Sequence, residues 1–295
     1  MPLKLTIVTP SYNQGIFIDQ TIRSVLNQDY KNLEYIVIDG GSTDDSLNII
    51  NSYSLKISKI ITEPDKGQSD AINKGFNIAS GEILGWLNSD DVYLPGALNK
   101  VADYFEQNPE CKWVAGNCIF TDIFLKPAWQ YNVPNIQPEE YLKFWEGNYL
   151  SQPSVFFKKE LFDEVGGLNI NLHYAMDLDL WLRFMSISPL HVINTDLSIN
   201  RTYPNTKTST GKEDAINEIA DIIFNSSLNK QQGYNLSFIK SSLKHYFITI
   251  GKNTFRSDLD NVFKNIAGYK LRFTDKLQLL AITIKRFISQ LIFNN

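Results

Sequence analysis

Two neighbouring carboxylates, Asp90 and Asp91, follow an apolar run and could hold a metal ion. The run, residues 83–87, is long enough for a buried strand, and only Asn88 and Ser89 separate it from the carboxylates. Adjacent carboxylates repel each other and are costly to desolvate, and a divalent cation relieves both effects. Oxygen ligands suit Mg²⁺ or Mn²⁺, which proteins often hold with one or two carboxylates plus substrate phosphates. The alternative is an ordinary polar turn that caps the next helix.

The segments before this run predict how such a site would be placed. Segments with strand-like patterns, at residues 4–9, 34–39, 57–62 and 83–87, alternate with segments of helical periodicity. Alternation with short connections predicts a parallel α/β sheet with right-handed crossovers. Ligands of such sheets bind beyond the carboxyl ends of the strands. Polar clusters follow those ends at residues 9–13, 39–42, 63–68 and 88–91. We therefore expect the clusters to converge on one crevice.

The pattern changes after residue 95. The predicted elements there are a helix at 98–105, strands at 113–120 and 151–157, and a helix at 177–185. An aromatic-rich section separates the two strands, and beyond residue 212 the periodicity is helical only. We therefore predict two parts, a catalytic domain over residues 1–210 and a helical C-terminal extension over residues 211–295.

Composition narrows the classes of function. The 295 residues have an apolar fraction of 43% and a net charge of −4, so a real core is expected and nucleic acid is not an expected partner. Three histidines argue against a histidine triad or a zinc site. The predicted strand that lies between Cys111 and Cys118 and includes the latter would hold them too far apart to form a disulfide, and free thiols fit a reducing cytosol. With no signal peptide evident after Met1 and no apolar run of the ~18–20 residues that span a membrane, a cytoplasmic location is expected.

Five segments together carry a resemblance to a known family. Residues 6–13 read TIVTPSYN, 36–44 read IVIDGGSTD, 63–75 read EPDKGQSDAINKG, 81–91 read GEILGWLNSDD, and 177–183 read DLDLWLR. In this order they resemble family 2 glycosyltransferases with the GT-A fold, a Rossmann-like, mostly parallel sheet flanked by helices. The likeness extends over about residues 3–210. It is specific for the family and much less so for the donor or the acceptor.

The resemblance implies an inverting, metal-dependent transfer of one sugar from a nucleotide-diphosphate sugar to a hydroxyl acceptor, a glycan or a lipid-linked molecule. The sugar would be a hexose or an N-acetylhexosamine, with a UDP-sugar as the commonest donor in the family and Mn²⁺ or Mg²⁺ as cofactor. Surface polysaccharide or glycolipid assembly is the expected role. The Gln-x-x-Arg-Trp block of processive synthases is absent, which favours transfer of a single sugar.

The family's metal motif is usually Asp-x-Asp, and here the resemblance places Asn88-Ser89-Asp90 at it. Asp90 is then the metal ligand, and Asn88 accepts weakly or contacts the ribose, so we expect weaker metal affinity. The nucleotide-sugar site implied by the family comprises Thr9, Pro10, Ser11, Tyr12, Asp39, Lys66, Gly67, Gln68, Asn88, Ser89 and Asp90. Turns, helix caps and solvated surface are the alternatives for these positions.

The chemistry also needs a group that accepts the proton of the acceptor hydroxyl. In the family this base is the Asp of a Glu-Asp pair, which reads Met176-Asp177 here, so Asp177 is the implied base. The alternative for Asp177 is a helix N-cap. Gln152 and Trp181 are the residues implied on the acceptor side.

The family also often carries a histidine late in the catalytic domain, and here Tyr203 stands in its place. The expected contribution of a histidine to the metal or the diphosphate is therefore in doubt. Lys207 or Arg201 could neutralise phosphate charge instead.

The last segment, residues 269–295, reads as a basic amphipathic helix. It could lie on the inner face of the membrane as a peripheral anchor, or pack on the catalytic domain or on a second subunit of a homodimer.

Two rival functions remain. A sugar-nucleotide nucleotidyltransferase would need a Gly-rich basic loop after the first strand, but residues 10–15 contain no Lys or Arg. A non-catalytic binding protein could keep the fold, and the retained Asp90 and Asp177 argue against it.

Overall fold

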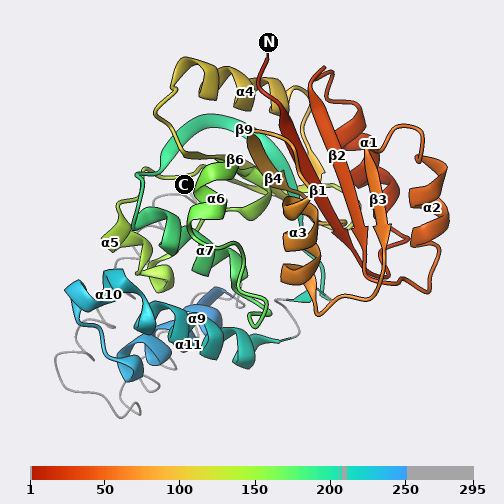
Figure 1. The fold of residues 1–295 in the computed structure, drawn as a ribbon. Helices are drawn as coiled ribbons and strands as arrows, with labels where there is room; N and C mark the ends of the chain where they lie inside the picture. The colour runs from red at the N-terminus through yellow and green to blue at the C-terminus, as the bar shows by residue number, and fades with distance from the viewer. Residues whose placement is uncertain (1, 205, 208–210, 251–295) are drawn as a thin grey trace.

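The computed structural model describes residues 2–204, 206–207 and 211–250 of the chain. The predicted membrane or packing helix over residues 269–295 lies outside these residues. A nine-stranded sheet in the order β3-β2-β1-β4-β8-β6-β9-β5, with β7 paired to β6, forms the centre of the molecule (Figure 1). Its strands are β1 (Leu5–Ser11), β2 (Leu33–Asp39), β3 (Lys59–Thr62), β4 (Ile83–Trp86), β5 (Val92–Tyr93), β6 (Trp113–Thr121), β7 (Pro127–Tyr131), β8 (Val155–Lys158) and β9 (His191–Arg201).

Helices cover both faces of this sheet. Those of the first part are α1 (Ile18–Leu26), α2 (Ser46–Ser52), α3 (Gln68–Asn77), α4 (Ala97–Gln107), α5 (Pro138–Tyr141), α6 (Lys159–Glu164) and α7 (Met176–Met185), with 3₁₀ turns η1 (Phe144–Glu146) and η2 (Gln152–Ser154). The C-terminal part adds α9 (Lys212–Asn225), α10 (Ser227–Gln232) and α11 (Leu236–Ile250), which lie beneath α7 in Figure 1.

The strand directions confirm the predicted mostly parallel α/β sheet. Strands β1 to β4 are parallel where they pair, and β6 is parallel to β9. Because β8 is antiparallel to both β4 and β6, all six of these strands point the same way. Their carboxyl ends therefore meet at one edge, where Ser11 pairs with Asp39 and Thr121 pairs with Arg201.

Two hydrophobic clusters hold the layers together. The first packs α1, α2 and α4 against one face, with Ile22 and Val101 fully buried. The second packs α3, α6 and α7 against the other, around Phe76. Ile219 of α9 and Leu243 of α11 belong to this second cluster. The domain boundary near residue 210 stays a prediction, and the described apolar packing crosses it.

Several segments differ from the sequence expectations, among them β5 and β7, which were not predicted. The strand predicted at 151–157 begins only at Val155, because Gln152–Ser154 form a 3₁₀ turn around Pro153. Strand β9, which the sequence analysis did not predict, mixes polar and apolar residues without regular alternation and is mostly half-buried. Its place between β6 and β5 is nevertheless central to the site, because it delivers Arg201 to the edge with the other strand ends.

The two cysteines behave as predicted. Cys111 and Cys118 are both free and buried. Burial raises the pKa of the Cys111 thiol to about 12 and that of Cys118 to about 11, so neither is a reactive thiolate at neutral pH.

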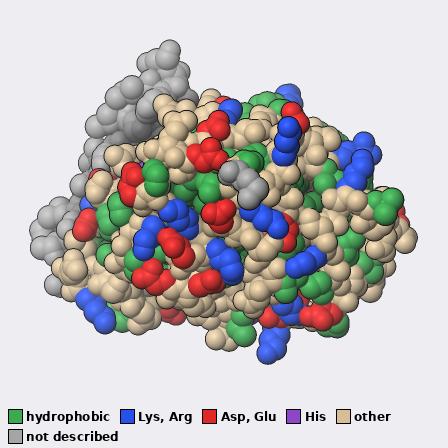
Figure 2. Space-filling model, turned by 45° about the horizontal axis from the view of Figure 1, so that its top comes forward, with side chains coloured by type: hydrophobic (Ala, Val, Ile, Leu, Met, Phe, Trp, Pro, Cys, Tyr) green, Lys and Arg blue, Asp and Glu red, His purple; other side chains and the backbone are tan. Residues whose placement is uncertain are grey.

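The surface carries both signs of charge. On the face in Figure 2, Lys and Arg side chains lie interspersed with Asp and Glu, in keeping with the small net charge of −4. Within the described ranges, no helix combines the length and the apolar character needed to cross a membrane.

Candidate active site

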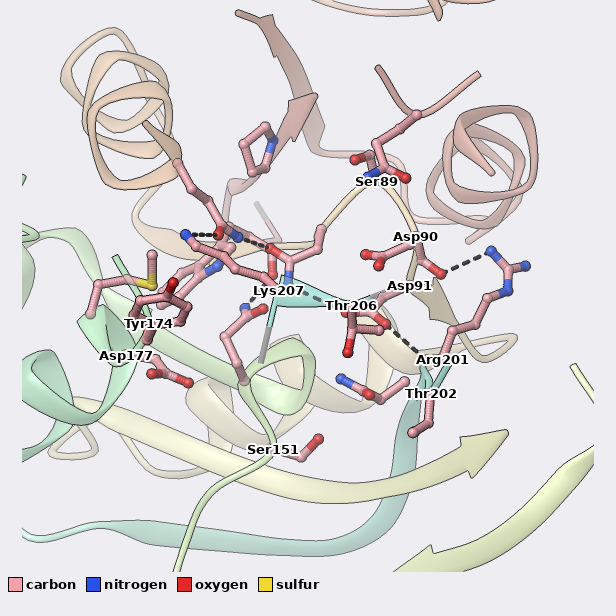
Figure 3. A pocket seen from close by; sticks show the side chains of 18 of the residues that line it. Ser89, Asp90, Asp91, Ser151, Tyr174, Asp177, Arg201, Thr202, Thr206 and Lys207 are labelled. Carbon is pink, nitrogen blue, oxygen red and sulfur yellow. Dashed lines mark hydrogen bonds between the residues drawn. The ribbon is translucent and has the colours of Figure 1, made fainter. Parts of the chain in front are cut away.

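A cavity of about 780 Å³ opens at the carboxyl edge of the sheet, where the polar clusters were expected to converge (Figure 3). Asp90 and Asp177, which lie 87 positions apart in the chain, both line it. The other predicted site residues in its lining are Pro10, Ser11, Tyr12, Gly67, Gln68, Asn88, Ser89 and Gln152. The structure therefore brings the ends of β1, β4 and β9, the start of α3 and the first turn of α7 to one place.

Several buried polar atoms at this cavity lack a partner among the described residues. They are the Oγ atoms of Ser11 and Ser151, Oε1 of Gln152 and Nε of Arg201. Buried polar groups are normally hydrogen-bonded, and exceptions often mark a place where a ligand completes the bonding. Gln152 is fixed for such a contact, because its Nε2 already donates to the Trp86 carbonyl at 2.8 Å.

The loop that carries the carboxylates is tied down from behind. Thr21 of α1 places its hydroxyl 2.9 Å from the Ser89 carbonyl and 2.8 Å from that of Asp91. Asp91 is buried, and its oxygens accept from the Arg201 backbone N–H at 3.1 Å and, weakly, from the Asn88 amide at 3.4 Å. Burial, and next the charge of Asp90, raise the pKa of Asp91 well above its ordinary value. Asp91 is thus a support of the loop.

Asp90 itself faces the cavity in front of this support (Figure 3). Its Oδ2 accepts from the Tyr203 hydroxyl at 2.9 Å, and its carbonyl accepts from the Arg201 guanidinium at 2.8 Å. Burial raises the pKa of Asp90, while the Tyr203 hydrogen bond and the Arg201 charge oppose the rise. Arg201 also bonds Gln20 and lies over the Phe17 ring at 5.0 Å, so this arginine braces the loop.

The oxygen atoms at this loop fit a divalent cation that shares its ligands with a diphosphate. No group of three or more His, Cys, Asp or Glu side chains that could hold a metal occurs within the described ranges. The available ligands are the Asp90 carboxylate and the amide oxygen of Asn88, which accepts from Gln68 at 2.7 Å. Mg²⁺ in particular is commonly bound through one or two carboxylates plus substrate phosphates rather than by an all-protein cage.

Four predicted residues lie outside the lining formed by the described residues. Asp39 is fully buried, and its carboxylate accepts from the Gly41 and Ser42 backbone N–H groups at 3.0 and 2.8 Å and from the Ser42 hydroxyl at 2.6 Å. Thr9 is buried too and accepts from Tyr35 at 3.0 Å. The side chains of both residues are therefore engaged within the fold.

The other two are Lys66 and Trp181. Lys66 is exposed, and its backbone N–H donates to Asp70 at 3.0 Å. Trp181 is fully buried and stacks on Trp86 and Trp113, with ring centroids 5.4 and 5.8 Å away. The structure therefore places Trp181 in the core and not at the surface where an acceptor could reach it.

Asp177 occupies the first turn of α7 and lines the opposite part of the cavity (Figure 3). It is not the N-cap, which is Ala175; its Oδ1 instead accepts from the Leu178 N–H at 2.8 Å. Burial raises the pKa of the Asp177 carboxyl to about 6, and the charge of Glu218 adds to the rise. A carboxyl group with a pKa near the working pH is suited to accept and release a proton.

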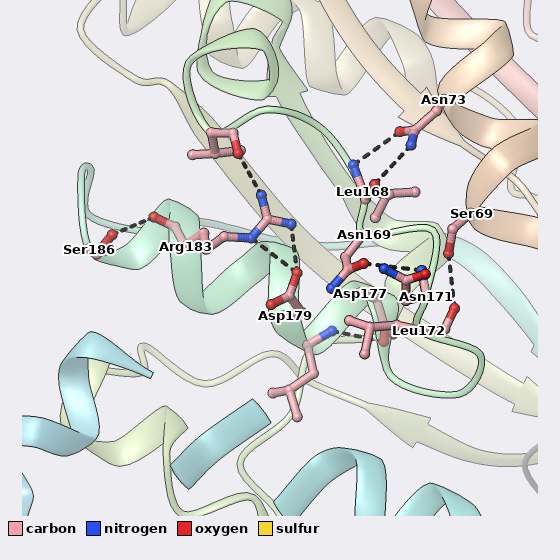
Figure 4. Close-up of polar contacts among 12 residues, drawn as sticks. Ser69, Asn73, Leu168, Asn169, Asn171, Leu172, Asp177, Asp179, Arg183 and Ser186 are labelled. Carbon is pink, nitrogen blue, oxygen red and sulfur yellow. Dashed lines mark hydrogen bonds and ion pairs between the residues drawn. The ribbon is translucent and has the colours of Figure 1, made fainter. Parts of the chain in front are cut away.

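The loop before α7 is held by side chains from α3 (Figure 4). Asn73 donates to the Leu168 carbonyl at 2.8 Å and accepts from its N–H at 3.0 Å. Ser69 donates to the Leu172 carbonyl at 3.3 Å. On α7, Arg183 bonds Asp179 at 2.7 Å and the Val165 carbonyl at 2.9 Å, which ties the helix back to its own loop.

The sequence analysis missed an aromatic wall of the cavity, which we define as Phe120, Trp129 and Tyr149. Trp129 is 48% exposed and stacks on Phe120 with centroids 4.6 Å apart, and Tyr149 stacks on Tyr131 at 4.5 Å. The aromatic-rich composition of this section was visible in the sequence. The hairpin of β6 and β7, which turns two of these rings toward the cavity, was not.

Comparisons with known proteins agree with this geometry. The profile of glycosyl transferase family 2 matches residues 6–166, more than half of the chain. An uncharacterised glycosyltransferase of Rickettsia typhi is 29% identical over 301 residues, covering 96% of this chain and 86% of the relative.

Two solved structures share the fold. S. aureus TarS 1–349 in complex with UDP-GlcNAc has a TM-score of 0.61 at 16% identity, with coverage of 90% of this chain and 80% of the 1–349 fragment. The mannosyltransferase PcManGT of Pyrobaculum calidifontis, in complex with GDP-Man and Mn²⁺, also reaches 0.61, at 15% identity and with coverage of 97% and 88%. The chain belongs to glycosyl transferase family 2, and its sheet has the GT-A architecture that the sequence motifs predicted.

Proposed function

We propose that the chain is an inverting, metal-assisted glycosyltransferase that moves one hexosyl or N-acetylhexosaminyl unit from a nucleotide-diphosphate sugar to a hydroxyl acceptor. One observation carries the proposal: Asp90 and Asp177 line a single cavity, and the pKa of Asp177 is raised to about 6. The relative that binds UDP-GlcNAc and the one that binds GDP-Man make these two nucleotide sugars the first donors to test.

The donor side of the cavity is formed by the ends of β1 and β4 and the start of α3. Ser11, Tyr12 and Gln68 face the nucleotide, and Gly67, whose φ of +119° favours glycine, lets the backbone approach it. Asp90 and the amide oxygen of Asn88 would hold Mn²⁺ or Mg²⁺ together with the diphosphate. When bound, the cation stabilises the negative charge of the leaving diphosphate as a Lewis acid.

Asp177 accepts the proton on the other side of the cavity. The acceptor oxygen forms its bond to the anomeric carbon while the bond from that carbon to the phosphate oxygen breaks, and the electron pair leaves with the nucleoside diphosphate. The proton of the hydroxyl passes to the Asp177 carboxylate. Attack from the face opposite the leaving group inverts the anomeric centre, as it does when a base activates water in inverting glycosidases.

The aromatic wall gives the acceptor a surface. Aromatic rings with one exposed face bind the apolar face of a sugar ring, and ligand pockets combine such rings with a few fixed polar groups. Trp129 offers the ring and Gln152 the polar group, so we propose that a glycan, free or on a lipid carrier, is the acceptor. Assembly of a surface polysaccharide or glycolipid, a cytoplasmic or membrane-peripheral location and a homodimer remain predictions.

The test is release of nucleoside diphosphate from UDP-GlcNAc, UDP-glucose and GDP-mannose with Mn²⁺, with and without sugar acceptors. We expect at least one donor to be turned over, EDTA to stop the reaction, and Asp90→Asn to lower it by about 10²-fold, an effect typical of losing a transition-state electrostatic contact. Asp45→Asn, at an exposed acidic residue that does not line the cavity, is the control. A turnover rate that is unchanged both by EDTA and by Asp90→Asn would refute the metal-assisted scheme.

A further inference from the structure

Glu218 lies on α9, yet it reaches the loop that leads into α7, the helix that carries Asp177. Its Oε1 accepts from the backbone N–H groups of Tyr174 and Ala175 at 2.6 and 2.7 Å, and its Oε2 accepts from that of His173 at 2.8 Å. One carboxylate therefore binds three consecutive N–H groups, the last of which belongs to the N-cap of α7. Asp177 follows two residues later.

These bonds satisfy backbone N–H groups at and just before the start of α7, and the Ala175 N–H among them is one of the helix's own first N–H groups. The first N–H groups of a helix have no partner within the helix, and at α7 no side chain of the N-cap residue accepts from them. A carboxylate at this end is favoured by the helix dipole, and hydrogen bonds to an ionised acceptor are stronger than neutral ones. Glu218 thus fixes the direction in which α7 begins, and with it the place of the Asp177 side chain.

The start of the C-terminal part is fitted to the same loop. Gly211, next to α9, packs so closely on the Tyr174 ring that a Cβ at this position would collide with it. Ala215 and Ile219 of α9 are buried, so apolar packing brings the helix to the loop and Glu218 adds the polar contacts. Without α9, the loop before α7 would lose the apolar packing and the Glu218 hydrogen bonds together.

Charge gives Glu218 a second effect. Burial is the largest cause of the raised pKa of Asp177, and the negative charge of Glu218 raises it further, whereas Lys207 lowers it. Tyr141 of α5 also faces Asp177, and its own pKa is raised by burial and by the Asp177 charge. Glu218 hydrogen-bonds the loop and raises the proton affinity of the carboxyl group, whereas Lys207, whose ammonium lies 5.9 Å from the Tyr174 ring centroid, lowers it.

We propose that Glu218 is a positioning residue for Asp177, so that the C-terminal helices complete the active site of the N-terminal part. The proposal rests on the proposed function only in taking Asp177 as the base. It assigns to residues 211–250 a role in catalysis, and it predicts that the N-terminal part without α9 has the donor side of the site but lacks an ordered base.

The experiment compares Glu218→Gln, Glu218→Ala and the control Asp221→Asn in the full chain. Asp221 lies on the same helix, is more exposed, and its nearest cation is Lys240 at 3.9 Å. Carbon-13 NMR of aspartate-labelled protein follows the Asp177 carboxyl, identified by its loss in Asp177→Asn, and needs no substrate. We expect Glu218→Gln to lower the pKa of Asp177 by at least half a unit below the wild-type value, because a negative neighbour is removed, and Asp221→Asn to leave it in place.

Turnover gives the second readout. Glu218→Ala should reduce kcat for transfer at least tenfold with little change in the KM for the donor, and Glu218→Gln, which keeps one acceptor oxygen, should lose less. An unchanged pKa of Asp177 in Glu218→Gln, or full kcat in a folded Glu218→Ala, would overturn the proposal. If the wild type turns over no donor, the proposed function fails, and the titration of Asp177 still decides the role of Glu218.

Discussion

The loops of Asp90 and Asp177 face one cavity but are held in different ways. The Asp90 loop continues a central strand, and the backbone of β9 and the side chains of Thr21 and Arg201 secure it. Asp177 lies in the first turn of α7, and the loop before this helix is held mainly by side chains, Asn73 on α3 and Glu218 on α9. In the proposed scheme, donor binding therefore depends on the sheet edge, whereas proton transfer depends on contacts between segments that are distant in the chain.

Asp177→Asn should show the largest effect. Loss of a general base typically costs 10²–10⁴-fold in rate, so we expect transfer to fall by about 10³-fold while donor binding, which belongs to the other loop, stays within about twofold. In the wild type, kcat/KM should fall below pH 6, because protonated Asp177 cannot accept the proton. Donor affinity by calorimetry and transfer rates over pH 5–9 provide the measurements. If donor affinity fell as much as the transfer rate, the two sides of the cavity would not be energetically independent, and the contrast between them would be wrong.

Asp177→Asn should also change stability, and here the expected effect is a gain, whereas the effect on activity is a loss. The folded-state pKa of Asp177, about 6, lies above that of an aspartate in the unfolded chain. The wild type therefore loses stability as the pH rises from about 4 to about 6, because only the unfolded chain releases the proton freely in this window. Asp177→Asn should be more stable than the wild type above pH 6, by up to roughly 3 kcal/mol, and equal to it below pH 4. Urea unfolding at both pH values measures the difference.

Arg201→Met tests the rigidity of the donor side. Arg201 is 3% exposed, and its charge lies beside Asp90 and Asp91. Its removal leaves the buried Asp91 and the half-buried Asp90 without their compensating cation, so we expect the free energy of unfolding to fall by about 3–5 kcal/mol. Arg183→Met is the matched control on the base side, since Arg183 pairs with Asp179 but is 30% exposed and should cost about 1 kcal/mol or less. Equal losses of unfolding free energy in the two variants, measured by urea unfolding, would contradict the proposed difference between the donor side and the base side.

The donor side was largely predictable from the sequence, and the base side was not. The strand-end rule places Ser11, Gln68 and Asp90 at one edge because the carboxyl ends of parallel strands all lie on the same side of a sheet. Asp177 was found through its resemblance to a family motif, since a carboxylate before an apolar helix reads equally well as a cap.

Long-range polar contacts carry no periodic signal, which explains what was missed. Glu218 sits 44 positions after Tyr174 on a helix whose pattern reports only its apolar face. Arg201 ends β9, a strand without regular alternation of polar and apolar residues. The sequence therefore indicated neither this strand nor the contact of Arg201 with the Asp90 loop. Asp39 shows the opposite case, a residue predicted to contact the ligand whose side chain has other partners in the structure. The family resemblance implied that it binds the nucleotide, but both of its carboxylate oxygens accept hydrogen bonds within its own turn.

Trp129→Ala should affect the acceptor alone. Stacking of a ring on an aromatic face is worth about 1–1.5 kcal/mol, so the KM for a sugar acceptor should rise about tenfold with donor hydrolysis unchanged. Phe124→Ala is the control, because Phe124 is exposed on the same hairpin but does not line the cavity. Methyl glycosides at millimolar concentration serve as acceptors. If both variants behave alike, the aromatic wall has no part in binding.

Tyr203→Phe should give the smallest change and sharpen the account of the donor side. The Tyr203 hydroxyl donates to Asp90 Oδ2 at 2.9 Å, so in the proposed scheme it competes with a cation for the same oxygen. The ring remains packed on Phe17, 5.2 Å away, and the loop keeps its Arg201 brace. A hydrogen bond of this kind contributes roughly 0.5–1 kcal/mol net. Because the cation no longer has to displace it, the Mn²⁺ concentration for half-maximal turnover should fall about threefold at pH 8. Tyr53→Phe, which removes a hydroxyl that donates to Asp19 at 2.6 Å away from the cavity lining, should leave it unchanged. A higher requirement for Mn²⁺ in Tyr203→Phe would mean that the phenol supports the cation instead of competing with it.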